Sequence, residues 1–353
     1  MTQTTKRLDY IDAAKAIGLL LVIYGHTFRE SMRAVHAWCD FSYVFVYRFH
    51  VPLLFVLSGM GYALTAQKNR ELSTAQFLRK KAHSLLLPWF SYSVLIYILF
   101  ALAQLLPPVR GFLSGTAYAL RTPLQYILLL LRNENPYSFH LWYLQTLFLF
   151  IIVTDLLDRL LSARQAHTVK WLLLLLLPGF YTLFCTHWVW TFKGFFQQYA
   201  YFLLGALLPR AWFERRAAPL ALCGAGCGAF VLFETFHPLT ALYEMPLTNL
   251  GMAYVDAVAV IGFCLGILAV CCLLQQHLQS LVRFGRSTML YYLYHQPFCC
   301  AVLGMVLYDK LHLPAVGVVA ACIIAGLSIP YLLHQLAGVL HLRPLLKLLG
   351  LPG

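Results

Sequence analysis

Charged residues are scarce in this sequence of 353 residues, because Asp, Glu, Lys and Arg together make up only 11% of it. Hydrophobic residues make up 61% of the chain, and the mean hydropathy is +0.72. These values exclude an ordinary soluble domain. The composition therefore predicts an integral membrane protein.

Acidic residues are fewer still, with 13 Asp and Glu against 26 Lys and Arg, which gives a net charge of +13. In a soluble protein this excess would suggest binding to nucleic acid. In a membrane protein it has another explanation, since basic residues gather in the loops that stay in the cytoplasm. No long polar stretch marks a second domain. We therefore expect one membrane domain over residues 1–353, in contact with membrane lipid and with no nucleic-acid partner.

The sequence also lacks cysteine spacings that are typical of metal or redox sites. Its 10 cysteines lie singly in apolar runs or as adjacent pairs, such as Cys271 with Cys272 and Cys299 with Cys300. We interpret them as small apolar residues packed between helices, and we expect no metal site. The first apolar run has no small-residue cleavage site after it, so we expect an uncleaved first span rather than a signal peptide.

Long apolar runs suggest an all-α, polytopic fold with about ten transmembrane helices. The expected spans are 14–34, 41–65, 85–106, 140–157, 171–188, 196–209, 217–234, 252–274, 287–308 and 315–341. The stretch from Tyr126 to Leu131 is too short to span and is expected to be an interfacial helix on the outer side. With an even number of spans, most basic residues fall on one side, which predicts that both termini are cytoplasmic.

Ionisable residues inside the first span are functional candidates, because each costs about 2.5 to 3.5 kcal/mol on insertion scales. Lys15 and His26 are eleven residues apart, so on a helix they share one face, separated by roughly 16 Å. Asp12 lies one turn before Lys15 on the same face. The pattern places a carboxylate and an ammonium at the cytoplasmic end, with an imidazole above them in the membrane.

The second span carries Arg48, His50 and Ser58 in an otherwise apolar run. Counted from the inner end at ~1.5 Å per residue, His50 comes to a depth similar to that of His26. A single buried histidine is usually structural, but two at one depth in consecutive spans favour a chemical role. Because histidine accepts a proton near neutral pH, the pair suggests a general base for a hydroxyl.

Six motifs in order resemble the membrane-bound acyltransferase family 3. The first is D-x-x-K followed by H, at Asp12, Lys15 and His26. The others are FHVPLLFVLSG (Phe49 to Gly59), FLRKKAHSLLLP (Phe77 to Pro88), HLWYLQTLF (His140 to Phe148), YFLLG (Tyr201 to Gly205) and FGRSTMLYYLYHQPF (Phe284 to Phe298). The second motif looks nearest to the fucose 4-O-acetylase-like branch, which acetylates sugars.

The resemblance implies a ten-span enzyme that moves an acyl group, expected to be acetyl, from cytoplasmic acyl-CoA to a sugar hydroxyl on a cell-envelope glycan. It also implies a place in the bacterial inner membrane. Acetyl-CoA or another acyl-CoA would be a co-substrate, with no bound cofactor. The acceptor would be a sugar or glycan, free or lipid-linked.

The family's (R/K)-x10-H pair falls on Lys15 and His26, its second histidine on His50 and its late histidine on His295. Many members carry Arg-x-x-Arg before the proline, where this chain has Arg79, Lys80 and Lys81. This departure changes the geometry offered to a CoA phosphate, because lysine lacks the bidentate fork of arginine.

The predicted site follows from these matches. His26 takes the proton of the acceptor hydroxyl, His50 orients it, and cations at the cytoplasmic side bind acyl-CoA. An acyl-enzyme on His26 or Ser58 is the alternative route. The predicted acyl-CoA-binding residues are Lys15, Arg79, Lys80 and Lys81, and the supporting residues are Asp12, Arg48, Ser58, Trp142 and His295.

Several residues have a second interpretation. Trp142 and Tyr143 suit either an aromatic belt or a platform for a sugar ring. Glu234, Glu244 and Asp256 are expected to be solvated loop residues unless they bind sugar hydroxyls. His295 suits a structural role as well as a catalytic one.

Two other functions compete with acyl transfer. A transporter or flippase for a lipid-linked sugar would also place His and Arg inside the membrane, although paired broken helices are not evident in the sequence. A sensor or scaffold would leave the buried histidines without a purpose.

Overall fold

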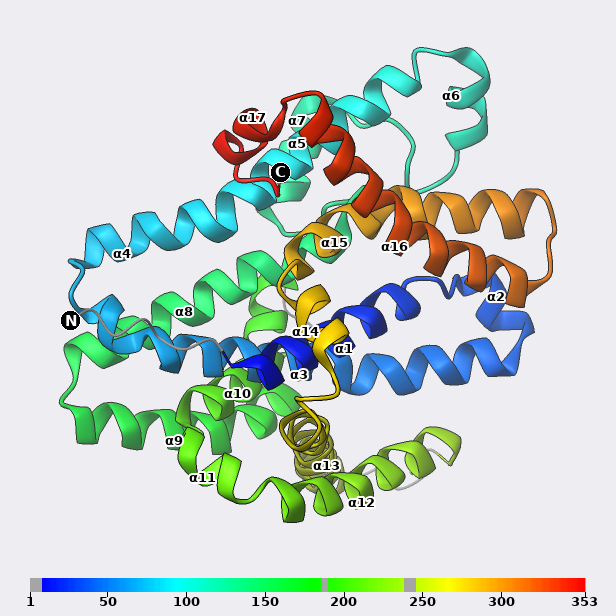
Figure 1. The fold of residues 1–353 in the computed structure, drawn as a ribbon. Coiled ribbons are helices and arrows are strands. Elements are labelled where there is room, and N and C mark those ends of the chain that lie inside the picture. The colour runs from blue at the N-terminus through cyan, green and yellow to red at the C-terminus, as the bar shows by residue number, and fades with distance from the viewer. Residues whose placement is uncertain (1–7, 186–189, 238–245, 353) are drawn as a thin grey trace.

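The computed structural model describes residues 8–185, 190–237 and 246–352, and every regular segment among them is helical (Figure 1). This confirms the all-helical fold. The α-helices in the first half are α1 (Asp9–Gly25), α2 (Glu30–Val35), α3 (Ala37–Arg70), α4 (Thr74–Lys81), α5 (Leu87–Ala103), α6 (Pro107–Leu113), α7 (Pro123–Leu131), α8 (Trp142–Leu160) and α9 (Ala163–Phe180). Those in the second half are α10 (Trp190–Leu207), α11 (Arg210–Arg215), α12 (Ala217–Phe236), α13 (Pro246–Leu273), α14 (Gln279–Gly285), α15 (Thr288–Tyr294), α16 (Ala315–Val339) and α17 (Arg343–Leu348).

Shorter turns of other helical types join these segments. They are the π-helices η1 (Ala82–Leu86), η3 (Tyr181–Cys185), η5 (His295–Val302) and η6 (Met305–Lys310), and the 3-10 turn η2 (Phe139–Leu141). The short segment expected near residues 126–131 is present as α7, whereas its interfacial position stays a prediction.

Eight helices among the described residues are long and apolar enough to cross a membrane, as expected of an integral membrane protein. They are Ala37–Arg70, Thr74–Ala103, Phe139–Leu160, Ala163–Phe184, Ala217–Phe236, Asn249–Leu273, Thr288–Lys310 and Ala315–Val339. The first and sixth expected spans coincide with α1 and α10, which fall outside this set. Helix α1 has only 17 residues, and α10 carries the polar residues Lys193, Gln197 and Gln198. The count of about ten is thus not confirmed.

Two of the expected spans are broken in the structure. Helix α1 ends at Gly25, with His26 as its C-cap, so residues 14–34 do not form one helix as expected. The ninth span breaks at Gln296, whose φ of −123° and ψ of 151° are extended. The physical reason for the second break is Pro297, because a proline disfavours helical geometry in the residue before it. A histidine lies at each of these two helix interruptions, His26 at the end of α1 and His295 just before the break at Gln296.

Glycines allow α3 and α10 to cross at close range. A Cβ atom at Gly59 would overlap the carbonyl oxygen of Phe202, and one at Gly205 would overlap that of Val56. Small residues permit such backbone approach between membrane helices. The FHVPLLFVLSG and YFLLG motifs therefore meet in space at their glycines.

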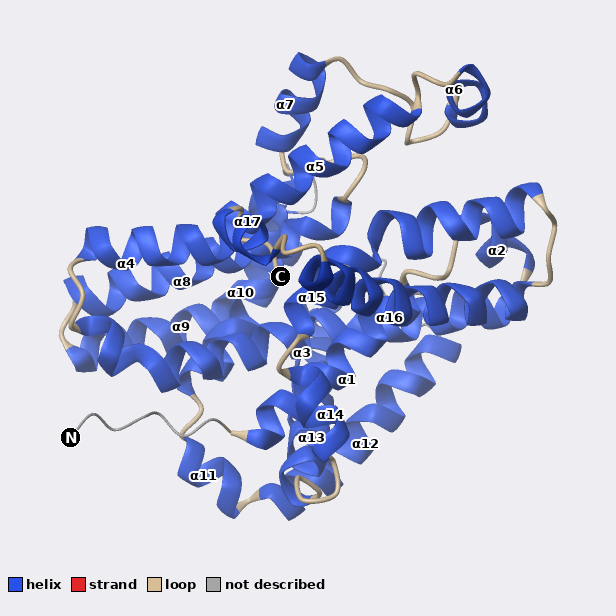
Figure 2. Ribbon diagram, turned by 45° about the horizontal axis from the view of Figure 1, so that its top comes forward, coloured by secondary structure: helices blue, strands red, loops and turns tan. Residues whose placement is uncertain are grey.

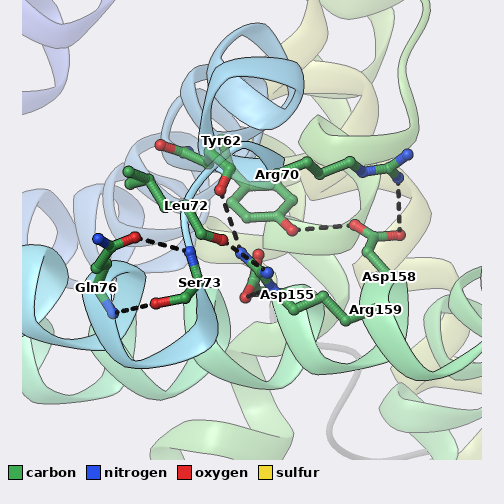
Figure 3. Close-up of polar contacts among 9 residues, drawn as sticks. Tyr62, Arg70, Leu72, Ser73, Gln76, Asp155, Asp158 and Arg159 are labelled. Carbon is green, nitrogen blue, oxygen red and sulfur yellow. Dashed lines mark hydrogen bonds and ion pairs between the residues drawn. The ribbon is translucent and has the colours of Figure 1, made fainter.

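A polar cluster joins α3, α4 and α8 at one end of the molecule (Figure 3). Arg159 donates hydrogen bonds to the Asp155 carboxylate at 2.7 Å and to the Leu72 carbonyl at 2.9 Å, while Tyr62 donates to Asp158 at 3.0 Å. In both overall views the α3–α4 and α8–α9 connections lie at this end, and α2 lies at the opposite end (Figures 1 and 2). The cluster fixes the turn from which α4 begins.

Candidate active site

Three histidines from distant parts of the sequence meet inside the helical bundle. The ring centroids of His26 and His295 are 5.3 Å apart, those of His140 and His295 are 5.0 Å apart, and those of His26 and His140 are 6.5 Å apart. His140 and His295 are buried, whereas His26 is half-buried. Each comes from an irregular point in a helix: the end of α1, the 3-10 turn before α8, or the break after α15. We call these three residues the histidine cluster.

The tautomer of His295 is set by the backbone. Its Nδ1 lies 3.0 Å from the carbonyl oxygen of Tyr291 and 2.9 Å from that of Tyr292, so Nδ1 carries the proton and donates it. In the neutral ring, Nε2 is then an acceptor, and it has no hydrogen-bond partner among the described residues. His295 therefore presents a bare acceptor nitrogen in the interior.

His140 is less satisfied still, since neither ring nitrogen makes a hydrogen bond within the described part of the chain. A neutral imidazole always carries one N–H donor and one acceptor. A buried polar group left unpaired costs about 1 to 3 kcal/mol. Such groups beside His26 and His295 are suited to bind a polar substrate, which would satisfy them.

Tyrosines hold the backbone around the histidine cluster. Tyr292 donates a hydrogen bond of 2.5 Å to the His140 carbonyl, and Tyr92 donates one of 2.5 Å to the Gln296 carbonyl. Both tyrosines are buried. The carbonyl groups at two of the three helix interruptions thus have fixed partners, which positions the imidazoles.

His50 joins the histidine cluster only through a tyrosine. Its Nδ1 donates to the Val46 carbonyl at 2.6 Å, and its ring centroid lies 4.8 Å from that of Tyr47. The Tyr47 hydroxyl lies 3.3 Å from Nδ1 of His26. The structure therefore brings the expected pair, His26 and His50, into contact with the same tyrosine.

Asp12 and Lys15 lie at the start of α1, as the spacing predicts. The Lys15 ammonium is 3.3 Å from the buried Asp12 carboxylate, which also lies 3.8 Å from the Arg286 guanidinium. Lys15 lies one turn further along α1 than the buried carboxylate and is itself partly exposed, at 34% of its side chain. The structure thus keeps a positive charge at the start of the helix that ends in His26.

The basic residues Arg79, Lys80 and Lys81 lie on α4, which is apart from α1 in both overall views (Figures 1 and 2). Lys80 donates to the Asn69 side chain at 3.1 Å, and the Lys81 ammonium lies 5.5 Å from the centre of the Phe77 ring. The structure does not bring these cations to Lys15.

Arg48 has carboxylate partners that the sequence interpretation did not foresee. Its guanidinium forms ion pairs with Glu234 of α12 and Asp256 of α13. Glu234 is buried, with 4% of its side chain exposed, so its expected place in a solvated loop is wrong. The third acidic residue of that group, Glu244, lies outside the described residues.

Ser58, Tyr143 and Trp142 pack inside the bundle. The Ser58 hydroxyl is 2.8 Å from the Tyr143 hydroxyl, and the Tyr143 ring lies 4.6 Å from that of Phe55. The Trp142 ring lies 6.1 Å from the same Phe55, which is fully buried. For Tyr143, these contacts favour a place toward the interior over an aromatic belt.

Four further residues belong to the site although they were not predicted from the sequence: Tyr47, Tyr92, His140 and Tyr292. His140 opens the HLWYLQTLF motif and Tyr292 lies in YYLYHQPF, so both were within recognised motifs. No group of His, Cys, Asp and Glu suited to a metal ion occurs in the described ranges. The site offers imidazole acceptors and an imidazole N–H, which is the chemistry of proton transfer.

Comparison with known families agrees with this chemistry. A family model described as an acyltransferase domain matches residues 8–335, nearly the whole chain. The match confirms the family expected from the six motifs, while the sugar-acetylating branch stays a prediction. No curated protein and no solved structure matches the chain.

Proposed function

Because the chain belongs to acyltransferase family 3, we propose that it moves an acyl group, with acetyl as the expected group, from acyl-CoA to a hydroxyl of a cell-envelope sugar. The acceptor is a glycan or lipid-linked sugar of the kind used by the fucose 4-O-acetylase-like branch. The membrane is the bacterial inner membrane. The observation that carries the proposal is the histidine cluster, in which both ring nitrogens of His140 and Nε2 of His295 are buried without a hydrogen-bond partner among the described residues.

In this proposal the acceptor hydroxyl attacks the thioester carbonyl carbon while His26 takes the hydroxyl proton. The tetrahedral intermediate then collapses, the carbon–sulfur bond breaks, and the proton passes from His26 to the departing CoA sulfur. His50 acts through Tyr47, which contacts both rings. Direct transfer is favoured over an acyl-enzyme on Ser58, because the partner of Ser58 is a tyrosine hydroxyl rather than a histidine.

The phosphates of the donor require cations on the cytoplasmic side. Lys15 lies near the start of α1, and His26 caps the other end of this helix. Lys15 could therefore bind the donor phosphates while the rest of the donor follows α1 toward His26. Arg79, Lys80 and Lys81 remain a second group of cations for this role, although α4 is apart from α1 (Figure 1).

The test is release of free CoA from acetyl-CoA by the purified protein in nanodiscs, with a panel of sugar acceptors. We expect the wild type to turn over and His26→Ala to lose at least about a hundredfold in kcat, the usual contribution of a general base. His167→Ala is the matched control, since this histidine is exposed and bonds to Trp171 on the surface. Equal rates for His26→Ala and wild type would remove His26 from the mechanism.

A second candidate function is translocation of a lipid-linked sugar. The interruptions after α1 and α15 favour it, because transporters build their binding sites from broken helices. Movement of a labelled lipid-linked sugar across proteoliposomes in the absence of acyl-CoA would support translocation. CoA release that depends on His26 would support acyl transfer.

A further inference from the structure

A cavity of about 410 Å³ opens between α14, α15 and α16, at the end of α15 far from His295. We propose that this cavity binds the phosphate groups of the acyl-CoA donor, an inference that rests on the acyl transfer proposed above. Arg283, Arg286, Ser287 and His334 are among the residues that line it.

The charge of the cavity suits a polyanion. Arg283 and Arg286 line it with His334. Arg286 is also paired with Asp9 outside the cavity, and no carboxylate is among the described residues that line the cavity. Arg283 forms no ion pair with any residue that the structure describes, and its one side-chain hydrogen bond is a long one of 3.4 Å to the Ser280 hydroxyl. Guanidinium groups bind phosphate through charge-assisted hydrogen bonds. The cavity therefore offers donors that a phosphate group would satisfy.

A second cavity of similar size shows the contrast. It measures about 450 Å³ and is lined by Asp9 and Glu214 as well as Arg210. Arg210 is already paired with Glu214 at 2.8 Å. With two carboxylates against one guanidinium, this second cavity repels a polyanion, so the α14–α16 cavity is the better candidate of the two.

The position of the cavity relates it to the histidine cluster. Arg286 lies 3.1 Å from Asp9 at the start of α1, and His295 contacts His26 at the end of α1. Helix α15 therefore runs beside α1 in the same direction. From Ser287 in the cavity wall to His295 is eight residues, or roughly 12 Å at the rise of an α-helix.

That distance suits a substrate with a charged head and a long, thin arm. Bound phosphates at Arg283 and Arg286 would leave the pantetheine arm to follow α15 and α1 and bring its thioester to His26 and His295. The cations of α4 lack this connection, because α4 is apart from α1 in both views (Figures 1 and 2). The α14–α16 cavity is thus placed to bind the donor together with Lys15, whereas Arg79, Lys80 and Lys81 on α4 are not.

The test compares two donors, acetyl-CoA and acetyl-pantetheine, which lacks the phosphates. We expect Arg283→Gln to raise the KM for acetyl-CoA about tenfold, since one charge-assisted hydrogen bond is lost. The KM for acetyl-pantetheine should be the same in Arg283→Gln and wild type. Arg164→Gln, which removes an exposed cation on α9, is the matched control for net charge. A rise that follows Arg79→Gln instead would overturn the proposal.

Equilibrium binding of free CoA to wild type in phosphatidylcholine nanodiscs separates the cavity from the enzymatic activity. Binding that depends on Arg283, without acyl transfer to any acceptor, would support the cavity and contradict the proposed function. Acyl transfer with CoA binding that is independent of Arg283 would overturn the cavity alone. Absence of CoA binding, with retention of phosphatidylglycerol by wild type but not by Arg283→Gln, would assign the cavity to a lipid headgroup.

Discussion

At the scale of single residues, His140 is the histidine for which the structure suggests a role that was not predicted from the sequence. Both of its ring nitrogens are buried and unpaired within the described chain, 5.0 Å from the His295 ring. Since Nε2 of His295 is an acceptor, we expect His140 to donate its N–H to the thioester oxygen as negative charge develops there. We expect His140→Ala to lower kcat about a hundredfold at nearly unchanged KM for acetyl-CoA.

His140→Gln provides the control, because its amide keeps a donor but cannot titrate. Activity should recover partly in His140→Gln with the pH profile of the wild type, whereas His26→Gln should remain inactive because the amide cannot accept a proton. Equal loss in His140→Ala and His140→Gln, or a changed pH profile in His140→Gln, would contradict the donor role. Steady-state kinetics at varied acetyl-CoA concentration and pH measures these values.

At the scale of the elements, the sequence predicted helices well and their interruptions poorly. Apolar runs locate spans, but hydropathy has no signal for the end of α1 at Gly25. The Gln296–Pro297 step carried a signal, since proline disfavours a helical residue before it. The partners of Arg48 lie 186 and 208 residues later in the chain, a pairing that only the packing of α12 and α13 on α3 creates.

The crossing of α3 and α10 gives a test at this scale. Gly205→Ala adds a Cβ that would meet the Val56 backbone, so the helices must separate, at a cost of about 1 to 3 kcal/mol. We expect a lower melting temperature in detergent, measured by tryptophan fluorescence. Gly226→Ala is the control, because a Cβ at Gly226 meets nothing within 4 Å and alanine favours the helix. Equal melting temperatures for Gly205→Ala and wild type would show that the crossing is looser than described.

At the scale of the whole molecule, the distribution of basic residues in the sequence predicts which loops face the cytoplasm. The structure shows at which end of the molecule those loops lie. The α3–α4 and α8–α9 connections lie together at one end (Figure 1), where Arg70 pairs with Asp158 and Arg159 with Asp155 (Figure 3). Lys170 pairs with Asp158 at the same end. The basic excess predicts that this end faces the cytoplasm. Proposed donor binding at Lys15 and the α14–α16 cavity requires the cytoplasmic face as well, because acyl-CoA is made inside the cell.

Reporter fusions test this orientation. A reporter that is active only in the periplasm should be inactive when joined after Gly353 and after Leu161, in the α8–α9 connection. It should be active after Ser114, in the connection between α6 and α7. The span that contains α5 precedes this connection and the span that contains α8 follows it, so the connection is expected on the outer side. An active reporter at Gly353 would mean an odd number of spans. In that case α1 or α10, the two helices outside the set of eight, would not cross the membrane. The reporter after Leu161 separates the two cases, because it would become active if α1 did not cross and would stay inactive if only α10 did not cross. Only the first result would rule out a donor track along α1 from Lys15 to His26.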